Sequence, residues 1–322
     1  MTQTVELTPA RELAQAVQQN IQQVMVGKTR EIQYVLVALL AGGHVLVEDV
    51  PGVGKTTLVR ALARSLGCRF QRLQFTPDLL PSDVTGVAVY NPQQGQFTFR
   101  EGPIFSQILL ADEINRTSPK TQSALLESME EGQATVDGVS HQLPRPFLVL
   151  ATENPIEYEG TFPLPEAQLD RFLIRLKLGY PSLEEERLIV QRSRLRPLEQ
   201  LTTVAAAEDV LAAQEMVAQV HLDPSLEDYT VRLVHKTRQH PDVYLGGSPR
   251  GSIALARSAQ ALALIRGRDY VTPDDIKEMA PLTLCHRVLL KPEARLNGTT
   301  PEKVLADVVA QVPVPVESGH GR

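Results

Sequence analysis

The sequence has no tryptophan and few other aromatic residues, with 7 Tyr and 8 Phe among 322 residues. Its two cysteines, Cys68 and Cys285, are far apart and form no C-x-x-C pair, which indicates neither a disulfide framework nor a zinc site. We therefore expect a reducing, cytoplasmic compartment. No apolar run reaches 18 residues, and residues 1–11 lack the charged-then-apolar order of a signal peptide, so no membrane span and no export are expected.

Positive charge is not in excess either. Lys+Arg 32 against Asp+Glu 38 gives a net charge of −6, and the chain has no basic run of five or more residues. Because surfaces that bind nucleic acid are usually basic, no nucleic-acid partner is expected. Hydrophobic residues make up 43% of the chain, which is enough for sizeable cores, and the length of 322 residues predicts two domains.

One stretch organises the first half of the chain. An apolar run at residues 44–47 leads into Pro51-Gly-Val-Gly-Lys-Thr56, and a helical pattern continues to about residue 67. Because glycine has no side chain, backbone N–H groups near Gly52 and Gly54 can surround an anion at the start of the helix. Lys55 would then contact the β- and γ-phosphates, and Thr56 would contact Mg²⁺. The expected nucleotide-binding residues of this loop are Pro51, Gly52, Val53, Gly54, Lys55, Thr56 and Thr57.

Two further segments bear on nucleotide binding. The general loop pattern begins with a glycine where this chain has Asp49, and Pro51 can preset the loop instead through its fixed φ. Upstream, the helical periodicity of residues 11–43 breaks at Val26-Gly27-Lys28. In proteins with this loop such a segment can lie against the adenine base, although a plain helix start fits the spacing of Val26 and Gly27 nearly as well.

Polar residues also follow two other apolar runs. Ile108-Leu-Leu-Ala-Asp-Glu-Ile-Asn115 predicts a buried parallel strand with two acids at its carboxyl end, where α/β sheets bind ligands. Asp112 is placed to join the Mg²⁺ shell, and Glu113 to orient or deprotonate the attacking water. The run at residues 147–151 ends close to Asn154, which could reach the γ-phosphate or the water, or could instead be a turn residue before Pro155.

The remaining pattern predicts the architecture. Apolar runs at 44–47, 68–75, 108–111, 147–151 and 172–178 predict five strands separated by helices, which form the parallel sheet of an αβα sandwich. Alternating runs at 86–90 and 96–100 predict a hairpin. Ser182 and Glu185 form a capping box, and helical patterns follow, so the predicted domains are 1–181 and an all-α domain at 182–322. Arg250, in the first turn of one of these helices, could reach a phosphate between the domains or pair with an acid of its own domain.

With these motifs in order, the sequence resembles the AAA+ ATPases and, among them, the MoxR family. The match runs from about residue 22 to 300. The segments that carry it are 48–56, 74–83, 102–105, 109–116, 120–127, 154–157, 163–172 and 247–250.

The resemblance implies a Mg²⁺-dependent ATPase that forms a homo-oligomer, a hexamer, and uses ATP to remodel or mature partner proteins or metalloenzyme complexes. It also implies a partner that bears a von Willebrand factor A domain. Position by position, it makes Asn154 the sensor 1 residue, Arg171 the arginine finger and Arg250 the sensor 2 arginine. The hairpin at 86–100 becomes part of the helix-2 insert, which faces the pore of such rings. Asp49 is normal for the family, whereas Glu153 stands where glutamine is more usual.

Two other functions stay open on the sequence alone. DNA-acting rings, such as helicases and clamp loaders, share the same ATPase core, although the acidic balance and the lack of a separate DNA-binding module count against them. A nucleotide-dependent structural switch would bind ATP without significant turnover. The complete set of Lys55, Asp112, Glu113, Asn154 and Arg171 counts against this second alternative.

Overall fold

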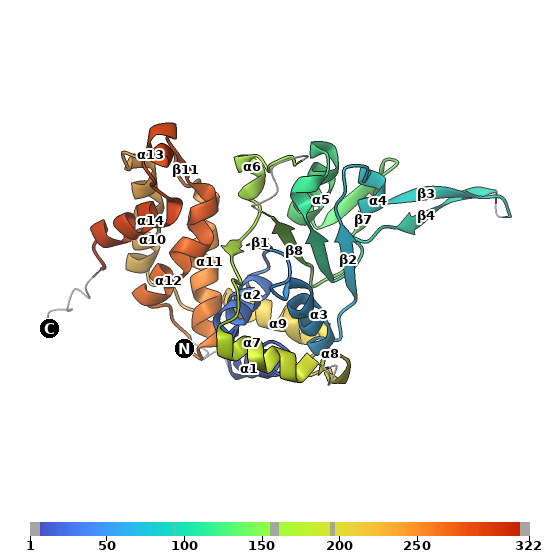
Figure 1. The fold of residues 1–322 in the computed structure, drawn as a ribbon, viewed down its shortest axis with the longest axis horizontal. Helices are drawn as coiled ribbons and strands as arrows, with labels where there is room; N and C mark the ends of the chain where they lie inside the picture. Colours follow the sequence, from blue (N-terminus) through green and yellow to red (C-terminus); the bar gives the residue numbers. More distant parts are fainter. Residues whose placement is uncertain (1–6, 94, 155–160, 194–196, 316–322) are drawn as a thin grey trace, which may run out of the picture.

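The computed structural model describes residues 7–93, 95–154, 161–193 and 197–315 (Figure 1). Residues 155–157 of the motif that begins at Asn154, and residues 316–322 of the tail that the sequence predicts to be a loose end, lie outside these ranges. A five-stranded sheet stands at the centre, in the order β2-β5-β8-β1-β9, and all its neighbouring strands are parallel. Its strands are β1 (Val45–Glu48), β2 (Phe70–Gln74), β5 (Ile108–Asp112), β8 (Leu148–Glu153) and β9 (Ile174–Leu176). The predicted α/β fold with five parallel strands is confirmed.

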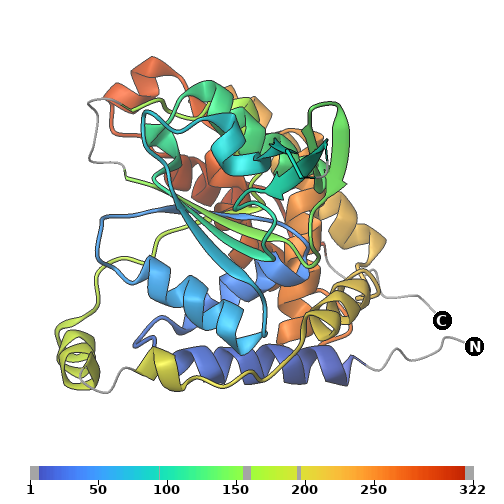
Figure 2. The same cartoon turned by 90° about the vertical axis from the view of Figure 1, so that its right-hand side faces the viewer.

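Alternate residues of the strands point to opposite faces of the sheet and enter two separate cores. Leu110 and Leu150 pack in one core, with the helices α1 (Thr8–Gln22), α2 (Thr29–Leu40) and α3 (Lys55–Ser65). Leu109 and Val149 pack in the other, with α4 (Pro81–Thr85) and α5 (Pro119–Glu131). The sheet is therefore the middle layer of a three-layer sandwich, as Figure 2 shows.

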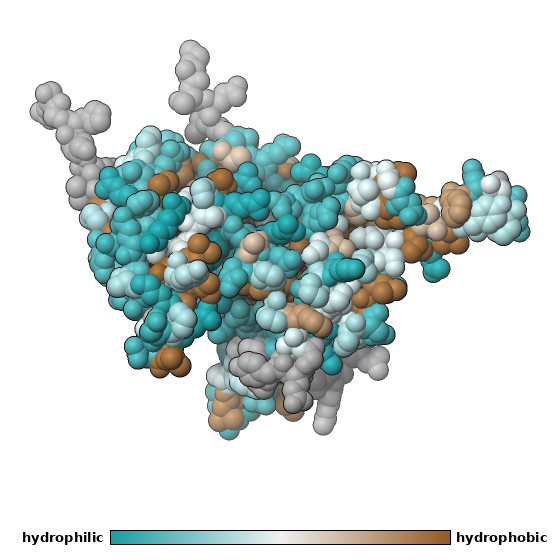
Figure 3. All heavy atoms as spheres, turned by 90° about the horizontal axis from the view of Figure 1, so that it is seen from above, coloured by the Kyte–Doolittle hydropathy of each residue, from teal (hydrophilic) through white to brown (hydrophobic). Residues whose placement is uncertain are grey.

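Two antiparallel hairpins leave the sandwich. The strands β3 (Gly86–Asn91) and β4 (Gln96–Glu101) form an arm that projects from the body, as the sequence predicts (Figures 1 and 3). The second hairpin, β6 (Gln133–Val136) and β7 (Val139–Gln142), holds the base of this arm, because the ring of Phe99 stacks on that of His141 with 3.9 Å between centroids. Gly86 begins the arm at φ +93, and a Cβ there would lie 2.3 Å from the carbonyl oxygen of Arg100.

The chain after residue 181 is helical, as predicted, but it also contains one short antiparallel strand pair, β10 (Val243–Leu245) and β11 (Leu289–Leu290). Strands of this length are too short to show alternation in a sequence. The helices are α7 (Leu183–Ser193), α8 (Pro197–Gln200), α9 (Ala207–Val217), α10 (Pro224–Gln239), α11 (Pro249–Ile265), α12 (Pro273–Leu284), α13 (Pro292–Leu296) and α14 (Pro301–Gln311). Three further helical segments complete the list: α6 (Glu166–Leu169), η1 (Ile114–Arg116) and η2 (Cys285–Arg287). Among the described helices, none combines the length and hydrophobicity that a bilayer span requires.

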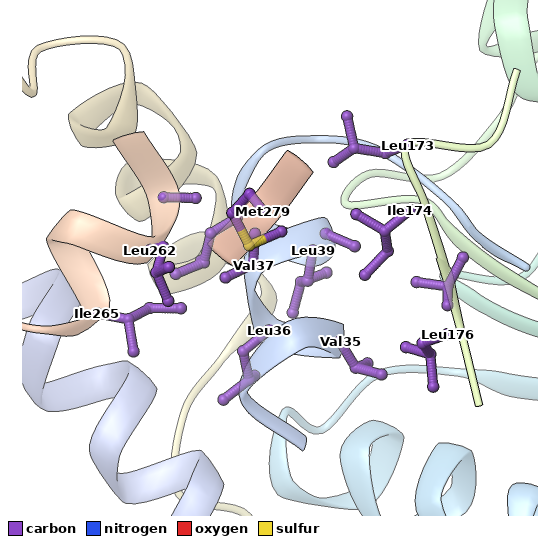
Figure 4. Packing of buried hydrophobic residues seen from close by; sticks show 14 of the residues in the cluster. Val35, Leu36, Val37, Leu39, Leu173, Ile174, Leu176, Leu262, Ile265 and Met279 are labelled. Carbon is purple, nitrogen blue, oxygen red and sulfur yellow. The ribbon is translucent and has the colours of Figure 1, made fainter. Parts of the chain in front are cut away.

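Helix α2 joins the sheet to the helices that follow it. Its apolar side chains lie between β9 on one side and α11 and α12 on the other, for example Val35 near Leu176 and Leu36 on the side of Leu262 (Figure 4). Residues of α9 also pack against this part: Gln214 donates a hydrogen bond to the carbonyl oxygen of Leu39 at 2.7 Å. The sandwich and the later helices thus share one continuous core, and the domain boundary at residue 181 stays a prediction.

A partly buried group of charges lies where β1, β8 and β9 meet α14. Glu48 and Glu153 occupy paired register positions at the ends of β1 and β8. Arg175 of β9 contacts Glu48 at 3.1 Å and Glu302 of α14 at 3.0 Å. Burial, and then the neighbouring Glu48 carboxylate, raise the pKa of Glu153 to about 7, an effect that Arg175 only partly offsets.

We predict that this carboxyl makes the protein less stable as the pH rises. The pKa of Glu153 is higher in the folded chain than its usual value of 4.5. The carboxyl therefore does not lower the free energy of unfolding at low pH, where it is protonated in both states. The free energy of unfolding then falls as the pH rises from 4.5 to about 7. Glu153→Gln should therefore raise the free energy of unfolding above neutral pH, by at most about 3 kcal/mol, and leave it unchanged near pH 4. Urea unfolding across this range measures the effect, with the exposed Glu131→Gln as a control. Parallel pH profiles for Glu153→Gln and the wild type would contradict it.

Candidate functional site

The predicted phosphate-binding loop connects β1 to α3. Gly52 and Gly54 adopt φ values of +86 and +94, which residues with a side chain rarely adopt, so the loop depends on glycine at both positions. Gly54 is the N-cap of α3, and Lys55 opens the helix. Lys55 Nζ donates to the carbonyl oxygens of Asp49 at 2.9 Å and Val50 at 3.3 Å. The ammonium group is therefore held against the backbone of residues 49 and 50, where the loop begins.

Asp49 ties this loop to the neighbouring strand. One of its carboxylate oxygens accepts the N–H groups of Leu178 at 2.6 Å and Gly179 at 2.7 Å, just beyond β9. The other accepts the N–H of Val50 at 2.9 Å. The residue is buried, and these three charge-assisted hydrogen bonds explain why a carboxylate can replace the glycine of the general pattern.

The two acids after β5 are held by side chains from β2 and β8. Thr152 donates to Asp112 Oδ1 at 2.7 Å and accepts the N–H of Glu113 at 2.8 Å. Arg72 pairs with Asp112 Oδ2 at 2.6 Å. Gln74 donates to Glu113 Oε2 at 2.6 Å. The sequence motifs predicted no role for Arg72, Gln74 and Thr152; the signal that could have found them is that each stands close to the carboxyl end of a strand beside β5.

Glu113 itself has an unusual backbone. Its φ is +57, in the left-handed region, which is uncommon for a residue with a side chain. This conformation turns the chain sharply from β5 into η1. Arg116 of η1 contacts Glu113 Oε2 at 2.9 Å, so the same oxygen receives Gln74 and Arg116. The carboxylate is therefore fixed in direction at the end of the strand.

The loop, the acid pair, Arg72 and Gln74 line one pocket of about 370 Å³. It is lined by Pro51, Gly52, Gly54, Lys55, Thr56, Thr57, Arg72, Gln74, Asp112, Glu113 and Asn154. The predicted loop, the acid pair and Asn154 meet here because the carboxyl ends of parallel strands share one edge of a sheet. The side chain of Val53 is buried in the core, and the predicted contact of this residue with nucleotide stays a prediction.

The pocket also offers ligands suited to Mg²⁺. The hydroxyl of Thr56 and the carboxylate of Asp112 are oxygen donors, which hard divalent cations prefer. Within the described ranges no three or more His, Cys, Asp or Glu side chains gather as a metal site. A cation held by Thr56 and Asp112 would therefore complete its shell with oxygens of a nucleotide and of water.

Val26 and Gly27 lie beside the loop, but not among the residues that line the pocket. A side chain on Gly54 would touch Met25 at 3.5 Å, and Gly27, at φ +74, leaves room for the side chain of Glu185 at the start of α7. Lys28 is buried and donates to the carbonyl oxygen of Leu178 at 2.6 Å. The segment thus packs between the loop and α7, and its contact with an adenine base stays a prediction.

Arg171 and Arg250 lie away from this pocket. Both contact the carboxylate of Glu130, near the end of α5: Arg171 Nε lies 3.1 Å from Oε2, and Arg250 Nη2 donates to Oε1. Arg171 precedes β9, so it lies at the amino edge of the sheet, whereas the loop lies at the carboxyl edge. At about 3.3 Å per residue, the two edges are roughly 15 Å apart. One alternative from the sequence was that Arg250 pairs with an acid of its own helical domain. In the structure its partner, Glu130, belongs to the sandwich instead.

Two protein-family models match separate parts of the chain. A model described as "ATPase family associated with various cellular activities (AAA)" matches residues 44–174, and one described as "AAA lid domain" matches residues 235–308. The first match runs from β1 to the first residue of β9 and includes the loop and both acids, and the second runs from the end of α10 into α14.

Individual proteins match along most of their length. "Uncharacterized protein YeaC" of Bacillus subtilis is 58% identical, covering 93% of this chain and 94% of that protein. "Chaperone MoxR1" of Mycobacterium tuberculosis is 44% identical, covering 92% and 80%. A crystal structure from Cytophaga hutchinsonii superimposes with a TM-score of 0.91 at 40% identity and covers 96% of this chain and 97% of its own. The chain belongs to the MoxR family of AAA+ ATPases.

Proposed function

We propose that the protein hydrolyses ATP within a ring of identical subunits and uses the energy to remodel or mature partner proteins. The observation that carries this proposal is the separation of two groups of residues in one subunit. The loop, the acid pair and Asn154 line a pocket at one edge of the sheet, while Arg171 and Arg250 lie together at the other. A head-to-tail contact between two copies would bring the groups together, and repeated contacts of this kind close into rings.

In the proposed reaction the loop N–H groups and Lys55 bind the phosphates of ATP. Glu113 accepts a proton from water as the water oxygen bonds to the γ-phosphorus, and the bond to the β–γ bridging oxygen breaks. ADP and phosphate are the products. Gln74 and Arg116 hold Glu113 for this role through one oxygen, and Asn154, in the same pocket, orients the water or the γ-phosphate.

Thr56 and Asp112 are the proposed Mg²⁺ ligands. Each carboxylate oxygen of Asp112 has a partner: Thr152 donates to Oδ1 at 2.7 Å, and Arg72 Nη2 lies 2.6 Å from Oδ2. The carboxylate is thus oriented before any ligand arrives. A bound Mg²⁺ would neutralise part of the phosphate charge.

The two arginines would act on the nucleotide of the neighbouring subunit. Both are tied to Glu130 at the edge opposite their own pocket, which favours action between subunits over action within one. An arginine supplied in this way can raise the rate by about 10³ to 10⁵. The family resemblance makes the ring a hexamer.

The arm formed by β3 and β4 is the proposed contact with client proteins. Near its tip Tyr90 and Phe97 are 51% and 71% exposed, and their rings lie 5.4 Å apart at a cross-strand pair. Exposed aromatic pairs are costly in a monomer and typical of binding surfaces. The name of the relative MoxR1, a chaperone, supports a protein client, and the family resemblance adds a partner with a von Willebrand factor A domain.

The first prediction tests the chemistry. Lys55→Ala should abolish ATP binding, because the ammonium group at the phosphates is lost. Glu113→Gln should bind ATP with unchanged affinity but hydrolyse it at least about 10²-fold more slowly, because the amide cannot accept the proton. Equilibrium binding and a single-turnover assay measure both. Normal turnover by Glu113→Gln would show that another group is the base.

The second prediction tests action between subunits. Specific ATPase activity should rise with protein concentration over the range where light scattering reports assembly. Arg171→Ala and Lys55→Ala should each be inactive, yet an equal mixture should recover roughly a quarter of the wild-type rate, because random mixing gives that share of complete interfaces. The exposed Arg232→Ala serves as the control. If the mixture stays inactive, Arg171 does not act across the interface.

The third prediction tests the client surface. Glu113→Gln with Mg·ATP should capture client proteins from the native lysate, and Lys55→Ala should not. Adding Phe97→Ala to Glu113→Gln should remove the captured client without affecting ATP binding, whereas Thr98→Ala, on the opposite face of the arm, should retain it. Capture of DNA or replication proteins would favour the DNA-acting alternative instead.

A further inference from the structure

We infer that Glu130 is a positioning residue that presents Arg171 and Arg250 as a pair to the nucleotide of the neighbouring subunit. The inference rests on the proposed function, in which both arginines act across the subunit contact. Glu130 lies in the last turn of α5 and is not among the residues that line the pocket of its own subunit. Its role would therefore be exerted only through the two arginines.

The carboxylate divides its oxygens between the two side chains. Oε2 lies 3.1 Å from Arg171 Nε, and Oε1 accepts from Arg250 Nη2. Arg171 belongs to the segment before β9, whereas Arg250 belongs to the first turn of α11, so a single acid joins arginines from the sandwich and from the lid. All three side chains remain partly exposed, with 36% for Glu130, 26% for Arg171 and 57% for Arg250. An incoming phosphate can therefore reach them.

Charge explains why an acid is needed between them. Two guanidinium groups brought to one place repel each other, and this repulsion opposes the arrangement that a polyphosphate requires. A carboxylate between them offsets the repulsion. The three groups together still carry one net positive charge, which attracts the nucleotide of the neighbour.

The contact geometry leaves donors for that nucleotide. Arg171 contacts Glu130 through Nε, and within the described ranges no other ion pair is recorded for this side chain. Its two terminal nitrogens can then contact a phosphate through two parallel N–H groups. A carboxylate at Nε sets the direction of the Arg171 guanidinium without competing with phosphate for its terminal nitrogens, whereas Arg250 gives one terminal nitrogen, Nη2, to Glu130.

The backbones of both arginines are fixed separately from Glu130. Asp170, next to Arg171, accepts from Ser248 Oγ at 2.9 Å and pairs with the buried Arg287 at 2.6 Å. Ser248 is also the N-cap of α11, and its hydroxyl accepts the N–H of Arg250 at 3.1 Å. These contacts join the lid to the sandwich without Glu130. Replacing Glu130 should therefore disturb side-chain directions and not the docking of the lid.

The test compares Glu130→Ala, Glu130→Gln and the neighbouring exposed control Glu131→Gln. With Mg·ATP at concentrations where the ring is assembled, Glu130→Ala should lower kcat by about 10- to 100-fold, the cost of misplacing a catalytic group by about 1 Å. Glu130→Gln should fall between Glu130→Ala and the wild type, because the amide keeps one of the two acceptor oxygens but loses the negative charge. KM, and the affinity of the dilute subunit for ATP, should stay unchanged in all three variants, and Glu131→Gln should keep the wild-type kcat.

Two further measurements show whether Glu130 acts through the arginines. In a chain that already carries Arg171→Ala and Arg250→Ala, adding Glu130→Ala should leave the residual single-turnover rate unchanged. An equal mixture of Glu130→Ala and Lys55→Ala subunits should recover activity, because the Lys55→Ala subunit still presents a correct arginine pair. A general folding defect would produce neither result.

The outcomes separate this inference from the proposed function. If Arg171→Ala loses activity but Glu130→Ala keeps the wild-type kcat, the positioning role is wrong and the action of Arg171 across the contact stands. If Glu130→Ala is faster than the wild type, Glu130 restrains the arginines, which also overturns the inference. If Arg171→Ala itself keeps full activity, the proposed action between subunits fails, and the inference fails with it.

Discussion

The structure depends on the parallel direction of its central sheet. Because β1, β5 and β8 run the same way, the segments that follow them converge at one edge, and that edge holds the phosphate-binding loop, the acid pair and Asn154. Segments that precede strands converge at the opposite edge, where Arg171 lies before β9. The chain direction alone thus separates the pocket from the arginines by the length of a strand. An αβα subunit with this arrangement presents two unlike faces, and this suits a ring of identical copies.

At the pocket edge, where the strands end, charged side chains supply the hydrogen bonds that backbone groups would otherwise make within secondary structure. Just beyond β9 the peptide groups of Leu178 are bound on both sides: the N–H by Asp49 at 2.6 Å and the carbonyl oxygen by Lys28 at 2.6 Å. Both charged residues are buried, so each hydrogen bond lies in an environment of low dielectric constant. The phosphate-binding loop, the break before α2 and the exit from β9 are consequently joined by two side chains of opposite charge.

The sequence was sufficient for features that depend on neighbouring residues. The loop glycines, the strand that ends in Asp112 and Glu113, the arm and most helix starts follow from short patterns, such as the Ser248-Pro249 start of α11. Arg72 and Gln74 could not be found in this way, because their role depends on β2 lying next to β5. Glu130 has no local signature, since its contacts come from elements about 40 and 120 residues away. The strands β10 and β11 are too short for any periodicity.

The arm formed by β3 and β4 is anchored to the body of the protein only at its base, as far as the described residues show. Its base is held where Phe99 stacks on His141 and meets Phe105, whereas Tyr90 and Phe97 lie near the outer end with most of their surface exposed. A strand of six residues is about 20 Å long, so a rotation of about 10° at the base moves the tip by about 3 Å. His141 belongs to the hairpin β6–β7, which begins directly after α5. A change in the packing at the end of α5 that rotated the base by this amount would therefore move the tip of the arm by about 3 Å.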